Sequence, residues 1–265
     1  MNRLAIGQYL PGDSLVHRLD PRTKIAITSV YVIVLFFINN PWGYALAVAF
    51  ALAGVLLSRV PLRYLIDGIR PILILILLTL VLNVFMTPGQ PIWKFGPLTA
   101  TREGLQSGVT LALRLILLIA VTSLLTLTTS PVALTDGLER LMKPLGRLGL
   151  PAHELAMMMT IALRFIPTLL EEAEKIMKAQ MARGADFESG NLVKRARALI
   201  PLLVPLFISS FRRADELAMA MEARGYHGGA GRTRYRQLRA RPADYLAGAV
   251  TLLFAGGLIY LRFRG

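Results

Sequence analysis

The 265-residue sequence contains no cysteine, which excludes disulfide bonds, thiolate catalysis and cysteine-bound metals. Its three histidines, His17, His153 and His227, are too far apart to match the ligand spacing of a metal site. No glycine-rich loop ends in Gly-Lys-Ser or Gly-Lys-Thr, so the chain lacks a phosphate-loop nucleotide site. Only 17% of the residues are charged, whereas 54% are apolar. The sequence therefore predicts an integral membrane protein without a cofactor or metal of its own.

Acidic residues are also scarce, with 16 against 30 lysines and arginines, which gives a net charge of +14. Charge of this sign is compatible with nucleic acid, anionic lipid or an acidic protein as partner. The basic residues collect at 18–24, 59–70 and 140–241 and avoid the long apolar runs. Because cytoplasmic loops carry an excess of lysine and arginine, we expect the N-terminus and residues 130–242 to be cytoplasmic. No secretory signal precedes the first apolar run, so we expect the N-terminus to be retained.

Five apolar stretches are candidates for membrane-spanning helices, which need roughly 20 residues each. They are residues 25–38, 44–57, 72–86, 105–127 and 245–261, of which the first two are short. We interpret residues 87–101, which are rich in proline and glycine, as a loop. The predicted fold is an all-α membrane protein with about five transmembrane helices and long cytoplasmic helices. Its predicted domains are residues 1–129 with four spans, the cytoplasmic residues 130–242, and residues 243–265 with the last span.

Two features within the predicted spans indicate contacts between helices of the bundle. Arg114 is the one charge well inside a span, and such charges are costly unless they are paired or reach the interface. We expect it to pair within the helix bundle or to snorkel, with a substrate role as an alternative. Gly104, Gly108 and Ala112 recur every four residues, a spacing typical of close helix contacts. We interpret them as packing positions of the bundle.

Residues 130–242 are periodic and contain two similar helices. The first is predicted from near Pro151 to Arg183, and the second from before Pro201 to Arg224. The two helices match at a fixed offset, and apolar residues recur every three or four positions in each. The matched pairs include Ile166 with Phe207, Leu170 with Phe211, Ala182 with Ala223, and Arg183 with Arg224. A helix pair that packs on itself explains the apolar stripes but not the identical endings.

Both helices end in the same tripeptide, Ala182-Arg183-Gly184 in the first and Ala223-Arg224-Gly225 in the second. Alanine permits a close approach to another backbone, arginine offers a rigid fork of donors for carboxylates, and glycine lets the chain turn away. Such a tip is suited to insertion into a groove of another protein. The alternative is that each arginine only complements the dipole of its helix.

The segment that leads to these tips resembles the transmembrane T component of energy-coupling-factor transporters. The resemblance rests on the runs Thr128-Thr129-Ser130-Pro131, Gly137-Leu138-Glu139, Leu148-Gly149-Leu150-Pro151 and Ile161-Ala162-Leu163-Arg164-Phe165-Ile166-Pro167, and on the two Ala-Arg-Gly tips. The N-terminal run His17-Arg18-Leu19-Asp20-Pro21-Arg22-Thr23-Lys24 is also similar to that family. The similarity covers nearly the whole chain.

The resemblance implies a subunit that is not an enzyme and that joins a substrate-capturing membrane S component to two cytoplasmic ATP-binding-cassette (ABC) ATPases. ATP would be bound by those ATPases, and the complex would import a vitamin or another micronutrient across the plasma membrane of a prokaryote. The implied ATPase-docking residues are Ala182, Arg183, Gly184, Ala223, Arg224 and Gly225. The implied contacts to the S component are Ile166, Leu170, Phe207 and Phe211.

Two other classes of function compete with this interpretation. A stand-alone membrane carrier or enzyme needs ionisable residues that converge within the spans, and the sequence offers little besides Arg114. A nucleic-acid binder would use the arginines between residues 232 and 241. Because these arginines directly precede the last span, we expect them to contact anionic lipid headgroups instead, and we expect no nucleic-acid partner.

Overall fold

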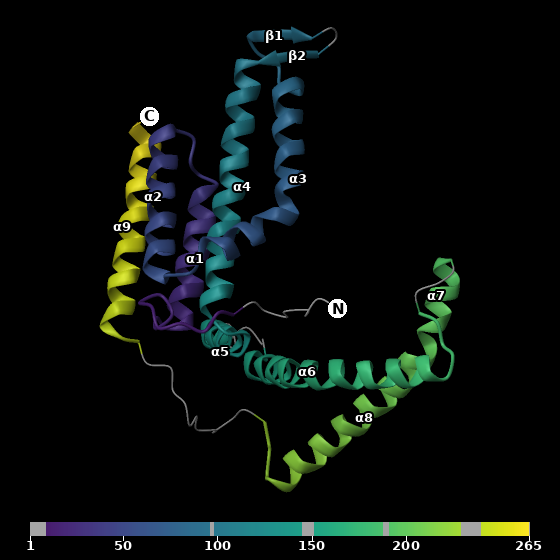
Figure 1. The fold of residues 1–265 in the computed structure, drawn as a ribbon. Coiled ribbons are helices and arrows are strands. Elements are labelled where there is room, and N and C mark those ends of the chain that lie inside the picture. The colour runs from purple at the N-terminus through teal and green to yellow at the C-terminus, as the bar shows by residue number, and fades with distance from the viewer. Residues whose placement is uncertain (1–8, 96–97, 145–150, 188–190, 229–239, 265) are drawn as a thin grey trace. The chain divides into compact units, whose positions relative to one another are not determined.

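The computed structural model describes residues 9–95, 98–144, 151–187, 191–228 and 240–264 (Figure 1). These residues are almost entirely helical. The chain divides into two compact units, of which the first comprises Met1–Leu141 with Gln237–Gly265 and the second Met142–Arg236. The predicted domain boundaries at residues 130 and 242 stay predictions.

The first unit contains six helices and one hairpin of strands. Its elements are α1 (Pro21–Leu35), α2 (Pro41–Ser58), α3 (Leu62–Met86), β1 (Pro91–Phe95), β2 (Leu98–Thr101), α4 (Arg102–Thr128), α5 (Pro131–Met142) and α9 (Pro242–Arg264). Helices α1 and α2 each begin at a capping residue followed by proline. Asp20 accepts a hydrogen bond from the backbone of Arg22, and Asn40 accepts one from Gly43, in each case with proline at the first helical position.

The core of the first unit forms around α1. Tyr31 and Leu35 are almost completely buried there, and the ring of Tyr31 clusters with those of Phe50 of α2 and Phe254 of α9, with ring centroids 5.7 and 5.6 Å away. The rings of Phe50 and Phe254 also stack on each other at 4.4 Å. Leu117 of α4 contributes to the same core. Although α1 is short, its buried residues therefore lie at the centre of the core that α2, α4 and α9 share.

Helices α3 and α4 form a hairpin that depends on glycine. A Cβ atom on Gly104 would lie 2.4 Å from the carbonyl oxygen of Asn83, and one on Gly108 would lie 3.2 Å from that of Leu80. Both contacts are with the backbone of α3, which cannot rotate away. The prediction that these glycines serve bundle packing is confirmed.

Arg114 pairs within the bundle, as predicted. Its guanidinium donates to the carbonyl oxygen of Ile38 at 3.1 Å and to the hydroxyl of Tyr44 at 2.8 Å, and it lies over the ring of Phe36. The arginine therefore ties α4 to the connection between α1 and α2. Both of these hydrogen bonds come from one terminal nitrogen, whereas the buried Nε has no hydrogen-bond partner among the described residues.

The interpretation of residues 87–101 as a loop is wrong. Residues 91–95 and 98–101 pair as antiparallel strands between α3 and α4 (Figure 1). Aromatic and β-branched residues such as Ile92, Trp93 and Thr99 favour strands, and this preference acts over segments too short for a clear alternation. The short helix α7 (Leu192–Ala198) was also not predicted.

The number of candidate spans agrees with the prediction, but their identity differs. By length and composition, five helices in the described ranges are able to cross a membrane: α2, α3, α4, α6 (Ala152–Ala182) and α9. Helix α1 is not among them because its 15 residues extend only about 22 Å. Helix α6 qualifies because only Glu154 and Arg164 are charged between residues 153 and 170. Its predicted place outside the membrane stays a prediction.

Candidate functional site

The second unit consists of the long helices α6 and α8 (Ile200–Ala223), with α7 before α8. Both long helices end as the sequence predicts, and Arg183 and Arg224 are their C-cap residues. The backbone angles of the two arginines are nearly the same, with φ −89° and ψ 8° at Arg183, and φ −92° and ψ 10° at Arg224. The repeat therefore extends to the backbone conformation of the tips.

The two tips share one hydrogen-bond pattern, the Schellman motif. In the first, the amide of Gly184 donates to Met181 at 2.9 Å and the amide of Ala185 donates to Gln180 at 2.9 Å. The second repeats these bonds from Gly225 and Tyr226, at 2.8 and 3.0 Å. Such a cap needs a residue with positive φ after the C-cap, and the values here are +86° and +69°. Glycine is required because other residues resist this conformation.

The tips differ in the residue that closes the motif. Ala185 stands opposite the polar Gln180 in the first tip, whereas Tyr226 stands opposite the apolar Met221 in the second. An apolar pair at these positions often accompanies the motif and stabilises it. The surfaces beside the two arginines are therefore chemically distinct.

All six residues of the two Ala-Arg-Gly tips are exposed. Within the described part of the chain, neither Arg183 nor Arg224 forms an ion pair. A guanidinium held at a rigid helix end with its five donors unused by the chain is a ready partner for a carboxylate. The geometry suits recognition of an acidic groove on another protein.

An ion pair joins the two helices at repeat-related positions. Arg213 of α8 donates to Glu172 of α6 at 2.8 Å, and the hydroxyl of Ser209 donates to the second carboxylate oxygen of Glu172. The side chain of Glu172 is only 23% exposed. The signal that identifies it is the offset of 41 residues between the repeats, which also relates Glu172 to Arg213.

This ion pair places the two tips symmetrically. Arg183 follows Glu172 by 11 residues, and Arg224 follows Arg213 by 11 residues. At 1.5 Å per residue, each arginine lies about 16 Å along its helix from the contact. The two helices thus form two arms that meet at this ion pair, extend equally far beyond it and end in equivalent arginines.

An apolar face on the same two helices is left uncovered by the described residues of the unit. Helix α8 has no buried residue, and the exposed fractions of Phe207 and Phe211 are 60% and 68%. The equivalent residues of α6, Ile166 and Leu170, are half-buried and 39% exposed. Large exposed apolar patches mark surfaces that contact protein or membrane.

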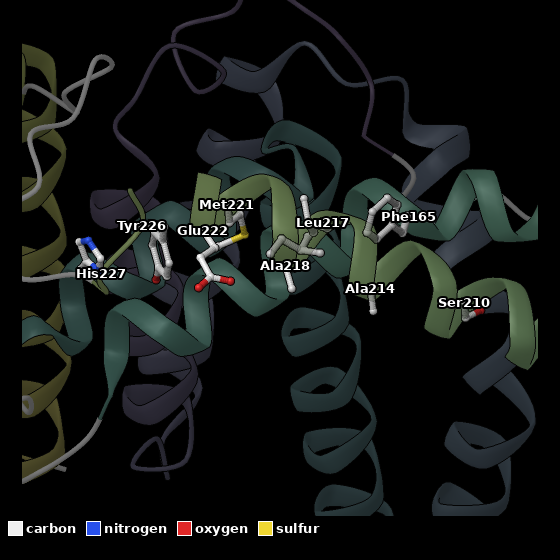
Figure 2. A pocket seen from close by; sticks show the side chains of 10 residues that line it. Phe165, Ser210, Ala214, Leu217, Ala218, Met221, Glu222, Tyr226 and His227 are labelled. Carbon is white, nitrogen blue, oxygen red and sulfur yellow. The ribbon is translucent and has the colours of Figure 1, made fainter. Parts of the chain in front are cut away.

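A groove of about 600 Å³ lies between the first half of α6 and the second half of α8 (Figure 2). Ile161 and Phe165 line it from α6, and Ala214, Leu217 and Met221 line it from α8. Tyr226 and His227, which follow the second tip, form its end together with Glu222 (Figure 2). His227 is an exposed loop residue that also borders this groove beside Arg224.

These features define a multi-pass helical membrane protein with a second unit whose two long helices expose arginine tips and an apolar face. A family model described as cobalt transport protein matches residues 12–235. Curated relatives named "Energy-coupling factor transporter transmembrane protein EcfT" are similar over nearly the full length. They include proteins of Thermosediminibacter oceani (61% identical, 99% of both chains), Clostridium kluyveri (58%, 94% of this chain and 93% of the relative) and Bacillus subtilis (51%, 99% of both). The chain belongs to this family of energy-coupling factor transporter transmembrane proteins, which confirms the predicted resemblance.

Proposed function

We propose that this chain is a non-catalytic subunit that couples two cytoplasmic ABC-type ATPases to an S component for uptake of a vitamin or another micronutrient. Family membership makes it the transmembrane energy-coupling component of an energy-coupling factor transporter. The observation that supports its coupling role is the pair of exposed, identically capped arginines at repeat-related positions. Two equivalent tips are suited to two copies of one kind of partner.

Arg183 and Arg224 each dock in a groove of one ATPase. The Schellman caps hold the arginines at defined positions, so little conformational entropy is lost when they bind. The small side chains of Ala182 and Ala223 let the ATPase surface approach the helix end. ATP is bound and hydrolysed by the ATPases, and this chain needs no cofactor of its own.

The apolar face around Ile166, Leu170, Phe207 and Phe211 contacts the S component. These residues lie before the ion pair of Glu172 with Arg213 in each helix, whereas the tips lie beyond it. Each arm therefore has an apolar part that contacts the S component and an arginine at its end that contacts an ATPase. Movement of a tip is transmitted along a continuous helix to the apolar part.

The topology follows from the charge distribution. We place the N-terminus and the helices α6 to α8 on the cytoplasmic side of a prokaryotic plasma membrane, because lysine and arginine accumulate there. The second half of α6 supports this placement, since Glu171, Glu174, Lys175 and Lys178 are incompatible with a lipid environment.

The proposal is tested by co-purification of the chain from its native membrane and identification of every bound subunit. Exchange of Arg183→Glu together with Arg224→Glu should release both ATPases while the chain still inserts, because each carboxylate would face an acidic groove. Arg212→Glu is the control, since it makes the same charge change as each single exchange but at an exposed position of α8 away from the tip. Retained ATPases in the double variant would refute the docking role. Accumulation of substrate by vesicles that contain this chain alone would favour a stand-alone carrier.

A further inference from the structure

Polar side chains are buried where four helices of the first unit meet. We call Asp20, Arg22, Lys24, Thr128, Thr129 and Asp244 the corner cluster, because α4 ends and α5 begins beside it. Of these, Asp20, Lys24, Thr128, Thr129 and Asp244 are each at most 6% exposed. The cluster includes much of the N-terminal run that resembles the family, and neither the tips nor the apolar face gives this run a role.

Lys24 holds the end of α4. Its ammonium group donates to the carbonyl oxygen of Thr128 at 2.9 Å, to the hydroxyl of Thr129 at 3.1 Å and to the carbonyl oxygen of His17 at 3.1 Å. The three donors of the ammonium are therefore all used. A positive charge at a helix C-terminus is stabilised by the helix dipole and satisfies a carbonyl that has no partner in the helix.

The two aspartates fix the beginnings of two other helices. Asp20 caps α1 and binds the guanidinium of Arg22, at 3.0 Å to Nε and 2.8 Å to the terminal nitrogen. Asp244 in the first turn of α9 accepts from the backbone amides of Asp20 and Arg241, both at 2.7 Å. With Lys24, the four charged side chains sum to zero. Asp20 and Arg22 form an ion pair, whereas Lys24 and Asp244 are satisfied by hydrogen bonds to backbone and hydroxyl groups, which makes the burial of these charges tolerable.

Helix α5 is held against the same corner by a close contact. A Cβ atom on Gly137 would lie 3.0 Å from Cβ of Pro21 and 3.1 Å from Cδ1 of Ile25. Ser130 caps α5 by accepting from the amide of Ala133 at 3.3 Å. The first helix after α4 is thus fixed both at its start, through the Lys24 contacts, and along its side, through Gly137.

We propose that Lys24 is a positioning residue that locks the corner between α4 and α5, so that α5 moves with the membrane helices as one body. This proposal rests on the coupling function above, in which a movement of the second unit is transmitted to the membrane helices. If Lys24 locks α5 to those helices, the movement reaches them through α5. The sequence-based division groups α5 with the cytoplasmic helices. The corner cluster instead groups α5 with the membrane helices, so that a movement of the helices α6 to α8 displaces α5 and the membrane helices together.

The experiment measures the distance between α5 and the membrane helices in the purified complex. Because the chain has no cysteine, cysteines introduced at Leu56 of α2 and Leu138 of α5, which are 75% and 47% exposed, are its only labelling sites. The chain is spin-labelled before the complex is assembled, so that no other subunit carries a label. Electron paramagnetic resonance then gives the distribution of the label distance, without nucleotide and with ATP plus vanadate. We expect one narrow peak in the unchanged chain, at the same position in both conditions.

Lys24→Met should lose this single narrow peak, because the carbonyl of Thr128 then lacks its donor. Thr129→Val removes only the hydroxyl acceptor and tests the same corner if the methionine variant does not insert. Lys24→Arg should restore the narrow peak, which a loss of general stability does not explain. Arg18→Met is the matched control, since its side chain is 63% exposed in the same segment.

Two results would overturn the proposal: an unchanged peak in both Lys24→Met and Thr129→Val, or a peak of the unchanged chain that shifts with ATP and vanadate. Failure of the coupling function is recognised separately, because co-purification would then recover no ATPase with the unchanged chain. The label distance within this chain is measured in either case and reports on the corner alone.

Discussion

Substitution of the glycines in the two tips tests the backbone conformation of a tip while leaving the charge of its arginine unchanged. Gly184 and Gly225 have φ of +86° and +69°, and a Cβ atom added to either would meet nothing within 4 Å. Alanine therefore costs only the strain of a left-handed backbone, roughly 1–2 kcal/mol. Because 1.4 kcal/mol is a factor of ten, the population of the capped tip falls at most about 5- to 30-fold relative to uncapped forms.

The affinity of an ATPase for a tip cannot fall by more than the population of the competent form. We expect Gly184→Ala or Gly225→Ala to weaken ATPase association by up to that factor, and asparagine at the same positions to weaken it less, because asparagine adopts this conformation more readily. Titration of purified ATPase against the chain in lipid nanodiscs measures the effect. Gly228→Ala is the control, with a φ of +88°, open surroundings and a place beyond the second tip.

The reasoning fails if asparagine weakens association as much as alanine, because charge and side-chain bulk would then matter more than backbone conformation. It fails equally if Gly228→Ala has the same effect as Gly225→Ala. A loss of association far beyond 30-fold would also contradict the calculation, since the strain in the left-handed conformation is about 2 kcal/mol at most.

Three further predictions concern stability. In a double-mutant cycle measured by thermal unfolding in detergent, Glu172→Gln and Arg213→Gln should show a coupling free energy of about 0.5–1 kcal/mol, because solvent screens this partly exposed pair. A coupling free energy of zero would mean that the pair does not join the helices. Gly104→Ala should destabilise the chain by about 1–3 kcal/mol, because the added Cβ atom would overlap with the carbonyl oxygen of Asn83. Gly256→Ala, which has open surroundings, should be neutral or stabilising, and equal melting temperatures of the two variants would contradict this prediction. The guanidinium hydrogen-bonded to Asp20 lowers the pKa of that carboxyl, so its contribution to stability is complete above its ordinary pKa near 4 and is lost as the pH falls through the lower folded value. Asp20→Asn should therefore destabilise the chain at pH 7 but have little effect in strong acid, and a difference in unfolding that does not depend on pH would refute the assignment.

Local signals determined much of the fold. Proline after a capping residue marked the starts of α1 and α5, and glycine after arginine marked the ends of α6 and α8. These signals act through hydrogen bonds between residues a few positions apart, so they can be read from sequence. The two Ala-Arg-Gly tips were predicted for the same reason, since a repeat is visible without any tertiary contact.

Contacts between distant segments were decided only by the tertiary structure. The sequence does not show that Lys24 reaches Thr128, more than 100 residues away, or that Asp244 binds the backbone of Asp20. It also counted α1 as a span, although that helix is short and buried among its neighbours. The sequence by itself determined helix ends, the repeat and the basic tips, because neighbouring residues fix them. Which helices enclose α1 and which polar groups are buried together depends on packing between elements that no local pattern encodes.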